Sequence, residues 1–347
     1  RRVADNRNVN DAFIVSAVRT PIGKFLGGLS PLAAPLLGAA VVREALRRAA
    51  VAPDRVDEAI LGSVLQAGLG QNPARQAALK GGLPHTVGAF TVNKVCGSGL
   101  KAVILAAQAI KAGDADVIVA GGMESMSNAP YLAPDARKGA RLGHVKMIDA
   151  MVHDGLWDAF NDFHMGTSCE LVAERFGISR ADMDAFSAAS HQRTLAATRA
   201  GRFRAEIVPV EKIEADEGPR EDSTPEKLAT LKPAFKPGGL VTAGNSAQIS
   251  DGASALVVMS EKALKEHQAT PLARITGYAT AGVDPKWVLV STIDAVRKFD
   301  ARNPWKAADA DLVEINEAFA ASTIAAIRDL KLDPARVNVN GGAVALG

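Results

Sequence analysis

The residue of this sequence best suited to covalent chemistry is Cys96, within Val95-Cys-Gly-Ser-Gly-Leu100. It follows a strand-like run at 90–92 and precedes an apolar stripe over 100–110 that predicts an amphipathic helix. Glycines let a ligand approach the backbone, and free N–H groups at a helix start favour a thiolate and a developing oxyanion. A lone intracellular cysteine is more often a small buried apolar residue, but its place at this turn favours a nucleophile.

The same turn fits a second interpretation. Gly97-Ser-Gly-Leu-Lys-Ala102 satisfies G-x-G-x-x-[GA] between a strand and a helix, which is the fingerprint of dinucleotide binding. Glu124 supplies an acidic residue at about the required separation. Because the fingerprint is short and does not require the preceding cysteine, a nicotinamide-dependent oxidoreductase is the weaker alternative.

Composition argues against several other classes of protein. The sequence has 40 Lys and Arg against 38 Asp and Glu, a net charge of +2, which makes nucleic acid an improbable main partner. Two cysteines, Cys96 and Cys169, cannot build a disulfide framework or a multi-cysteine metal site, so we expect no metal and a reducing compartment. The apolar runs are shorter than the ~20 residues of a membrane span, so we expect no membrane partner. Residues 1–10 lack both an initiator Met and the apolar segment of a signal peptide, so we expect a processed or truncated start.

Alternating strand and helix signals surround the cysteine. The sequence predicts strands at 12–18, 56–61, 90–92 and 116–120, with helices at 35–50, 73–79 and 100–112 between them. This order predicts a layered α/β domain with a buried sheet. The segment 127–245 is richer in Met, His, Pro, Gly and charge, and predicts an insertion over that core with a helix at 180–201. The core pattern, helix or strand, then returns at 251–260, and a further strand begins at 273.

Two parts of the chain resemble each other weakly. Val56-Asp-Glu-Ala-Ile-Leu-Gly62 matches Ala310-Asp-Leu-Val-Glu-Ile-Asn316, with an acidic residue leading a strand in both. The segment 91–100 likewise matches 336–347, a strand running into a turn of small residues. The pattern predicts an internal duplication of one α/β unit, with the insertion between the copies.

Eight motifs, in order along nearly the whole chain, resemble those of the thiolase family. They are Arg19-Thr-Pro-Ile-Gly-Lys-Phe25, Val92-Asn-Lys-Val-Cys-Gly-Ser-Gly99, Ala120-Gly-Gly-Met-Glu-Ser-Met-Ser127, His164-Met-Gly166, Thr242-Ala-Gly-Asn245, Asp251-Gly252, Glu314-Ile-Asn-Glu-Ala-Phe-Ala320 and Asn340-Gly-Gly-Ala-Val-Ala-Leu-Gly347. The resemblance implies an α/β thiolase fold: two duplicated βαβαβαββ halves in a layered α-β-α-β-α arrangement with an inserted loop domain. The N-terminal half would comprise 1–126 and 246–272, the coenzyme A-binding loop domain 127–245, and an incomplete C-terminal half 273–347.

The resemblance also implies a reaction. Cys96 would form an acyl-enzyme, through which two acetyl-CoA condense to acetoacetyl-CoA or a 3-ketoacyl-CoA is cleaved by coenzyme A. We favour acetyl-CoA C-acetyltransferase, with a broader 3-ketoacyl-CoA thiolase as the near alternative. Coenzyme A thioesters would be substrates, with no permanently bound cofactor. A homodimer or homotetramer is expected, in the cytoplasm or alternatively in mitochondria or peroxisomes.

Further site residues follow from the same resemblance. Asn316 would hold a water at the thioester oxygen of the enolising acetyl-CoA, and Glu317 would either orient the neighbouring loop or cap a helix. The coenzyme A contacts would come from His164 and Met165 at the pantetheine tunnel, Arg220 at a phosphate, Phe235 at the adenine, Ala243 and Ser246 through backbone or hydroxyl, and Ala318 and Phe319 at the inner end. Cys169 matches no catalytic position of the family and is interpreted as a structural thiol.

Two departures from the family pattern leave alternatives open. Thiolases carry a general-base His in a G-H-P segment after the Gly-rich turn, and a second catalytic Cys in C-x-G-G-G. The 347 residues of this sequence contain neither motif. We therefore expect the 347-residue chain to turn over poorly, and a catalytically impaired coenzyme A-binding fragment is a further alternative. Residues 283–294 lack the Met-Gly-x-Gly-Pro found there in many thiolases, so acyl chain length stays open.

Overall fold

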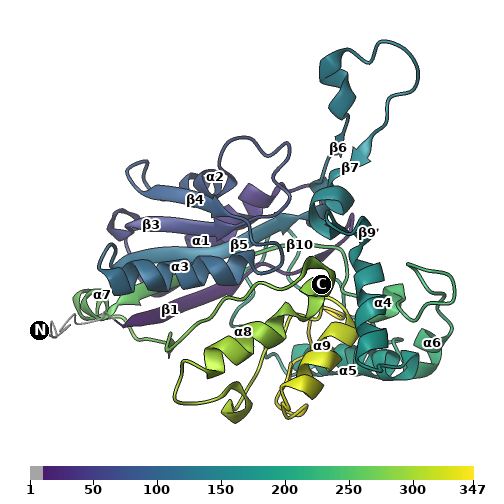
Figure 1. Cartoon of the computed structure of the whole chain (residues 1–347). Helices are drawn as coiled ribbons and strands as arrows, with labels where there is room; N and C mark the ends of the chain where they lie inside the picture. Colours follow the sequence, from purple (N-terminus) through teal and green to yellow (C-terminus); the bar gives the residue numbers. More distant parts are fainter. Residues whose placement is uncertain (1–10) are drawn as a thin grey trace, which may run out of the picture.

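The computed structural model describes residues 11–347, and its first part is built on a seven-stranded mixed sheet (Figure 1). The strand order is β11-β1-β10-β5-β3-β4, with β2 paired to β10. Strand β3 runs parallel to β4 and β5, whereas β10 is antiparallel to β1 and β5. The strands are β1 Ala12–Arg19, β2 Gly23–Lys24, β3 Glu58–Gly62, β4 Gly88–Val92, β5 Val117–Ser125, β10 Ser250–Ser260 and β11 Ala273–Arg274.

Helices cover both faces of this sheet. Helices α1 (Ala34–Ala49) and α2 (Pro73–Lys80) share a core with Ala59 and Leu61 of β3, whereas α3 (Ser98–Ala112) packs on the face that carries Ile60. Because neighbouring residues of a strand point to opposite faces, an unbroken apolar run is what a sheet buried on both sides requires. The predicted β-α-β-α-β alternation is confirmed, including the helix that follows Cys96.

The inserted segment and the end of the chain share a second core. Helices α4 (Met165–Arg175), α5 (Arg180–Arg199), α8 (Ser291–Asp300) and α9 (Ala320–Asp329) lie together in Figure 1. Buried Cys169, Met183, Ile293 and Ile324 come from these four helices. This core joins residues of the predicted loop domain, 127–245, to residues of the predicted C-terminal half, 273–347. The predicted domain boundaries therefore remain a prediction.

The remaining elements are short. Helices α6 (Pro225–Ala229) and α7 (Glu261–His267) complete the α-helices of residues 11–347, which also contain short 3₁₀ helices and the π-helix Met151–Leu156. Two small hairpins are formed by β6 (Tyr131–Leu132) with β7 (Ile148–Asp149) and by β8 (Trp157–Asp158) with β9 (Phe163–His164). The β6–β7 segment extends away from the body of the molecule as an arm (Figure 1).

The strands expected at 310–316 and from 336 onward are wrong as regular elements. Only one parallel bridge, Val313 with Val337, joins these segments. A two-stranded pairing is marginal on its own, and within residues 11–347 no further strand lies beside it. The segment 251–260, which the sequence left as helix or strand, is a strand because β1 and β5 pair with it on both sides.

Helix α3 also meets the length and composition of a membrane span, over Val95–Ala112. Its residues Ala102, Ala106 and Ile110 are fully buried against the sheet. An apolar helix with one face packed in this way is typical of the core of a globular protein.

Candidate active site

Cys96 lies at the apex of a tight turn between β4 and α3. The preceding Val95 has φ 49°, a left-handed conformation that is unusual for a β-branched residue. The Ser98 hydroxyl stabilises this turn, because its Oγ accepts from the Lys94 N–H at 2.8 Å and donates to the Val95 carbonyl at 2.5 Å. The turn leaves Cys96 exposed to solvent, as a nucleophile requires.

Glycines bring the start of α3 down onto the sheet. A Cβ at Gly62 of β3 would lie 2.6 Å from the Ser98 carbonyl carbon, and one at Gly122 of β5 would lie 3.3 Å from Gly99 Cα. The glycines of β3 and β5 thus allow the start of α3 to pack closely on the strands.

The electrostatic surroundings of Cys96 favour the thiol. Desolvation by the neighbouring protein raises the pKa of Cys96, the charge of Glu124 raises it further, and the hydrogen bond to its own backbone N–H lowers it. The backbone N–H group favours the thiolate, as expected, but desolvation and Glu124 outweigh it. Within residues 11–347 no cation contributes to this pKa. Nucleophilic attack consequently requires a general base.

Asn316 and Glu317 occupy one loop before α9 but face different surroundings. Asn316 is exposed, and its amide forms no hydrogen bond with any described residue, so it is available to a ligand. Glu317 is 1% exposed and accepts from Asn338, Ser190 and Val344. Helix α9 has Phe319 at its N-cap with no side-chain cap, so the helix-capping alternative for Glu317 is wrong.

Three predicted coenzyme A contacts form an aromatic cluster. The His164 ring stacks on Phe235 with centroids 4.8 Å apart, and Phe235 meets Phe319 edge-on at 6.2 Å. His164 also caps α4, because its Nδ1 accepts from the Gly166 N–H at 3.0 Å, which assigns the ring proton to Nε2. Burial lowers the pKa of His164, so the ring is neutral near pH 7 and can donate from Nε2.

Ser246 and Ala318 adjoin this cluster. Ser246 forms a bridge with Phe319, and the neighbouring Ala247 N–H donates to the Ala318 carbonyl at 3.0 Å. The Ser246 hydroxyl donates to the Thr242 carbonyl, so it can only accept from a ligand. Met165 is the first residue of α4 and packs against the second core.

Two other predicted coenzyme A contacts, Ala243 and Arg220, are exposed and lie outside the aromatic cluster. Ala243 is exposed at the start of a 3₁₀ turn. Arg220 has an exposed side chain that forms no bond to the aromatic cluster, and its backbone N–H donates to His191 Nδ1.

Cys169 is fully buried in the second core, and burial raises its pKa, which confirms a structural thiol.

Sequence reasoning missed buried polar residues that hold the segment between Phe235 and Ser246. Glu170 of α4 accepts from the Leu240 and Val241 N–H groups at 2.8 Å. Asn245 donates to Asp184 of α5 at 3.1 Å. For Glu170 the sequence signal was a polar residue in a helix, and for Asn245 it was a place in the motif 242–245, but neither signal names the partner.

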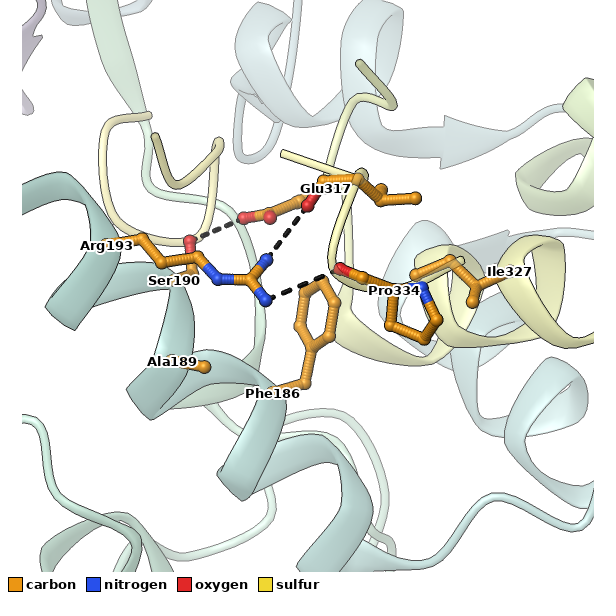
Figure 2. Close-up of a pocket in the computed structure, with 8 residues that line it drawn as sticks. Phe186, Ala189, Ser190, Arg193, Glu317, Ile327 and Pro334 are labelled. Carbon is orange, nitrogen blue, oxygen red and sulfur yellow. Dashed lines mark hydrogen bonds between the residues drawn. The ribbon is translucent and has the colours of Figure 1, made fainter. Parts of the chain in front are cut away.

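A cavity of about 70 Å³ adjoins the second core (Figure 2). Its lining includes Ser190, Arg193 and Glu317 and does not include Cys96. Ligand sites typically enclose ~300–1,000 Å³, whereas a water needs only ~10–15 Å³ of such volume. The cavity can therefore hold water but not coenzyme A.

Comparison with known proteins agrees with this geometry. Residues 12–262 match the family described as Thiolase, N-terminal domain, and 269–347 match Thiolase, C-terminal domain. The chain is 53% identical to an acetyl-CoA acetyltransferase of Pseudomonas aeruginosa and 50% identical to one of Cupriavidus necator, in each case over 98% of this chain and 88% of the relative. The crystal structure of the Bacillus anthracis acetyl-CoA acetyltransferase superposes with a TM-score of 0.96 at 42% identity, covering 99% of this chain and 89% of that one. With its strand-to-helix cysteine, its fold and its sequence in agreement, this chain belongs to the thiolase family of acyltransferases.

Proposed function

We propose that this protein is an acetyl-CoA C-acetyltransferase with Cys96 as its nucleophile. The observation that carries the proposal is the exposed thiol at the apex of the β4–α3 turn. Relatives of about 50% identity that are named acetyl-CoA acetyltransferase support the acetyl substrate.

The reaction proceeds through two exchanges of bonds at sulfur. A base takes the proton of Cys96, the sulfur bonds to the thioester carbonyl carbon of acetyl-CoA, the bond from that carbon to the coenzyme A sulfur breaks, and the base returns the proton to that leaving sulfur. A second acetyl-CoA then loses an α-proton to a base, and its carbon attacks the acyl carbon. The bond from that carbon to Cys96 breaks and the proton passes to the Cys96 sulfur, so that acetoacetyl-CoA forms and the thiol is restored. Asn316, with its free amide, holds the water that stabilises the developing oxyanion of the enolising thioester.

The aromatic cluster is the proposed pantetheine site, and we assign Phe235 to it rather than to the adenine because its ring stacks on His164. His164, Phe235 and Phe319 offer apolar faces, and the neutral His164 can donate from Nε2 to an amide carbonyl. Arg220 remains the proposed phosphate contact, because an exposed cation at the rim needs no preformed partner. Ser246 and Ala243 lie on the segment that follows Phe235. Met165 at the start of α4 and Ala318 beside Phe319 complete the proposed set.

The test is acylation of the protein by acetyl-CoA, followed by intact mass and peptide mapping. We expect one acetyl group on Cys96 and its loss in Cys96→Ser. The matched control is Cys169→Ser, which removes the buried thiol and should keep the acetyl group. Acetylation that survives Cys96→Ser, or maps elsewhere, would refute the nucleophile.

The broader thiolase activity is tested by thiolysis of substrates of different length. An acetyltransferase should cleave acetoacetyl-CoA much faster than a long-chain 3-ketoacyl-CoA. Preference for the long substrate would replace the acetyl assignment by that of a 3-ketoacyl-CoA thiolase.

We also propose a homo-oligomer in the reducing environment of the cytoplasm. Strand β4 ends the sheet and carries the exposed Phe90, and the β6–β7 arm carries exposed Tyr131, Leu142 and Met147. An unpaired strand edge and an exposed apolar arm both favour association with another copy. Light scattering should give a multiple of the 36.1 kDa chain mass, and a monomer at micromolar concentration would contradict the proposal.

A catalytic thiol also requires reducing conditions, which supports the cytoplasm as the compartment. Imaging of the protein in cells tests this proposal.

A further inference from the structure

We propose that Glu317 is a positioning residue for Asn316: its buried carboxylate fixes the loop that presents the Asn316 amide. The inference rests on the proposed function of Asn316. Glu317 is 1% exposed, and no Lys, Arg or His of residues 11–347 pairs with it. Its charge is stabilised by hydrogen bonds alone, so these bonds must be strong and well oriented.

Three donors from separate segments converge on the Glu317 carboxylate. Oε1 accepts from Asn338 Nδ2 at 2.8 Å, and Oε2 accepts from Ser190 Oγ at 2.7 Å and from the Val344 N–H at 3.1 Å. Ser190 lies on α5, 127 residues away in the sequence, and its bond to Glu317 is drawn in Figure 2. The carboxylate therefore joins the Asn316 loop, α5 and the turn that ends near Val344.

Asn338 extends this hold to the other side of Asn316. Its Oδ1 accepts from the Ile315 N–H and its Nδ2 donates to the Ile315 carbonyl, both at 2.8 Å. Its φ of 47° is a left-handed conformation that asparagine tolerates better than most residues. The residues on either side of Asn316 are thus anchored, while the Asn316 amide itself stays free.

The surroundings require a carboxylate rather than an amide. The Val344 N–H can only donate, and turning the Asn338 amide to present its oxygen would break both bonds to Ile315. Glutamine at 317 would therefore place an NH₂ group against a fixed donor in either orientation. The backbone at Gly342 packs directly on the Glu317 carboxyl group, because a Cβ at Gly342 would lie 2.4 Å from its carboxyl carbon. The side chain at 317 therefore has little room to move.

Arg193 also binds the segment 334–338, which carries Asn338. The Arg193 guanidinium donates to the Val337 carbonyl at 2.9 Å and the Pro334 carbonyl at 3.4 Å, and all three residues line the cavity of Figure 2. Glu317 and Arg193 thus both hold the segment that carries Asn338.

The test is Glu317→Gln in the full-length protein, with Glu314→Gln as matched control. Glu314 lies in the same loop, is exposed and accepts no hydrogen bond from a described residue. One unsatisfied buried group costs ~1–3 kcal/mol, so we expect Glu317→Gln to slow condensation about 10- to 100-fold. Acetylation of Cys96 should stay within about twofold, since Asn316 serves the later step. Hydrogen exchange should accelerate in peptides covering 313–319 and 338–344 but not in the sheet.

Three outcomes would overturn the inference. They are a condensation rate equal to that of Glu314→Gln, an equal fall in acetylation and condensation, and unchanged exchange in both peptides. If Glu317→Gln fails to fold, Ser190→Ala removes one donor and keeps the carboxylate. A smaller fall in condensation with acetylation retained then supports the inference, and no change overturns it. Absence of acetyl-Cys96 in the unsubstituted protein would instead refute the proposed function.

Discussion

At the scale of single residues, desolvation by the neighbouring protein and the charge of Glu124 both raise the pKa of Cys96. Burial raises the pKa of Glu124, while the Val64 and Leu65 N–H groups that donate to it lower that pKa. The ionised carboxylate then opposes a second negative charge on Cys96. We expect Glu124→Gln to lower the pKa of the Cys96 thiol, measured as the pH dependence of alkylation by iodoacetamide.

The control for this prediction is Glu58→Gln. Glu58 begins β3, whereas Gly62 at the other end of that strand contacts the start of α3, and burial raises the pKa of Glu58 too. This variant should leave the alkylation profile unchanged. An identical profile for Glu124→Gln would show that Glu124 does not act on the thiol.

His191 makes the stability of the fold depend on pH. Burial, followed by the charge of Arg220, lowers the pKa of His191 from 6.5 to about 4, against the opposing effect of Asp222. Its neutral Nδ1 accepts the Arg220 N–H. Because the folded pKa is lowered, this stabilisation is complete above pH 6.5 and is lost as the pH falls towards 4, by about 3 kcal/mol at most. Urea unfolding at pH 7.5 and pH 5 should show a smaller loss of free energy for His191→Gln than for the unsubstituted protein, and equal losses would contradict the prediction.

At the scale of elements, Arg19 at the end of β1 ties the inserted segment to the sheet. Its guanidinium donates to both oxygens of Asp216, at 2.6 and 2.9 Å, and to Glu206 at 2.6 Å. Removing one partner of a buried pair costs ~3–5 kcal/mol, so we expect Arg19→Ala to lower the free energy of unfolding by about 3 kcal/mol. The control is Lys265→Ala, which breaks an exposed pair with Glu261 and should cost less than about 1 kcal/mol. Equal costs in chemical denaturation would mean that the Arg19 contacts add nothing to the fold.

At the scale of the whole molecule, three apolar cores hold the elements of residues 11–347 in place. One core lies on each face of the sheet, and the core on the face that carries Ile60 holds α3, which follows the Cys96 turn. The second core named above joins the inserted segment to the end of the chain around Phe319. Met183 of α5 is fully buried in the second core, so Met183→Ala should destabilise it by ~2–5 kcal/mol. Hydrogen exchange should rise in α4, α5 and α9 and stay low in the sheet. The matched variant Leu37→Ala in α1 should reverse this pattern, and a uniform rise in both variants would indicate one undivided cooperative unit.

The sequence by itself determined the local features of this protein. The helix after Cys96, the strands on either side of it and the ordered series of motifs follow from apolar periodicity and residue type over short windows, because burial of one face is encoded locally. Tertiary structure decided the rest. Stacking of His164 on Phe235 and convergence of Asn338, Ser190 and Val344 on Glu317 join residues far apart in the sequence, and no local pattern names a distant polar partner. The expected strand at 310–316 failed for the same reason, since a strand exists only where a neighbour pairs with it.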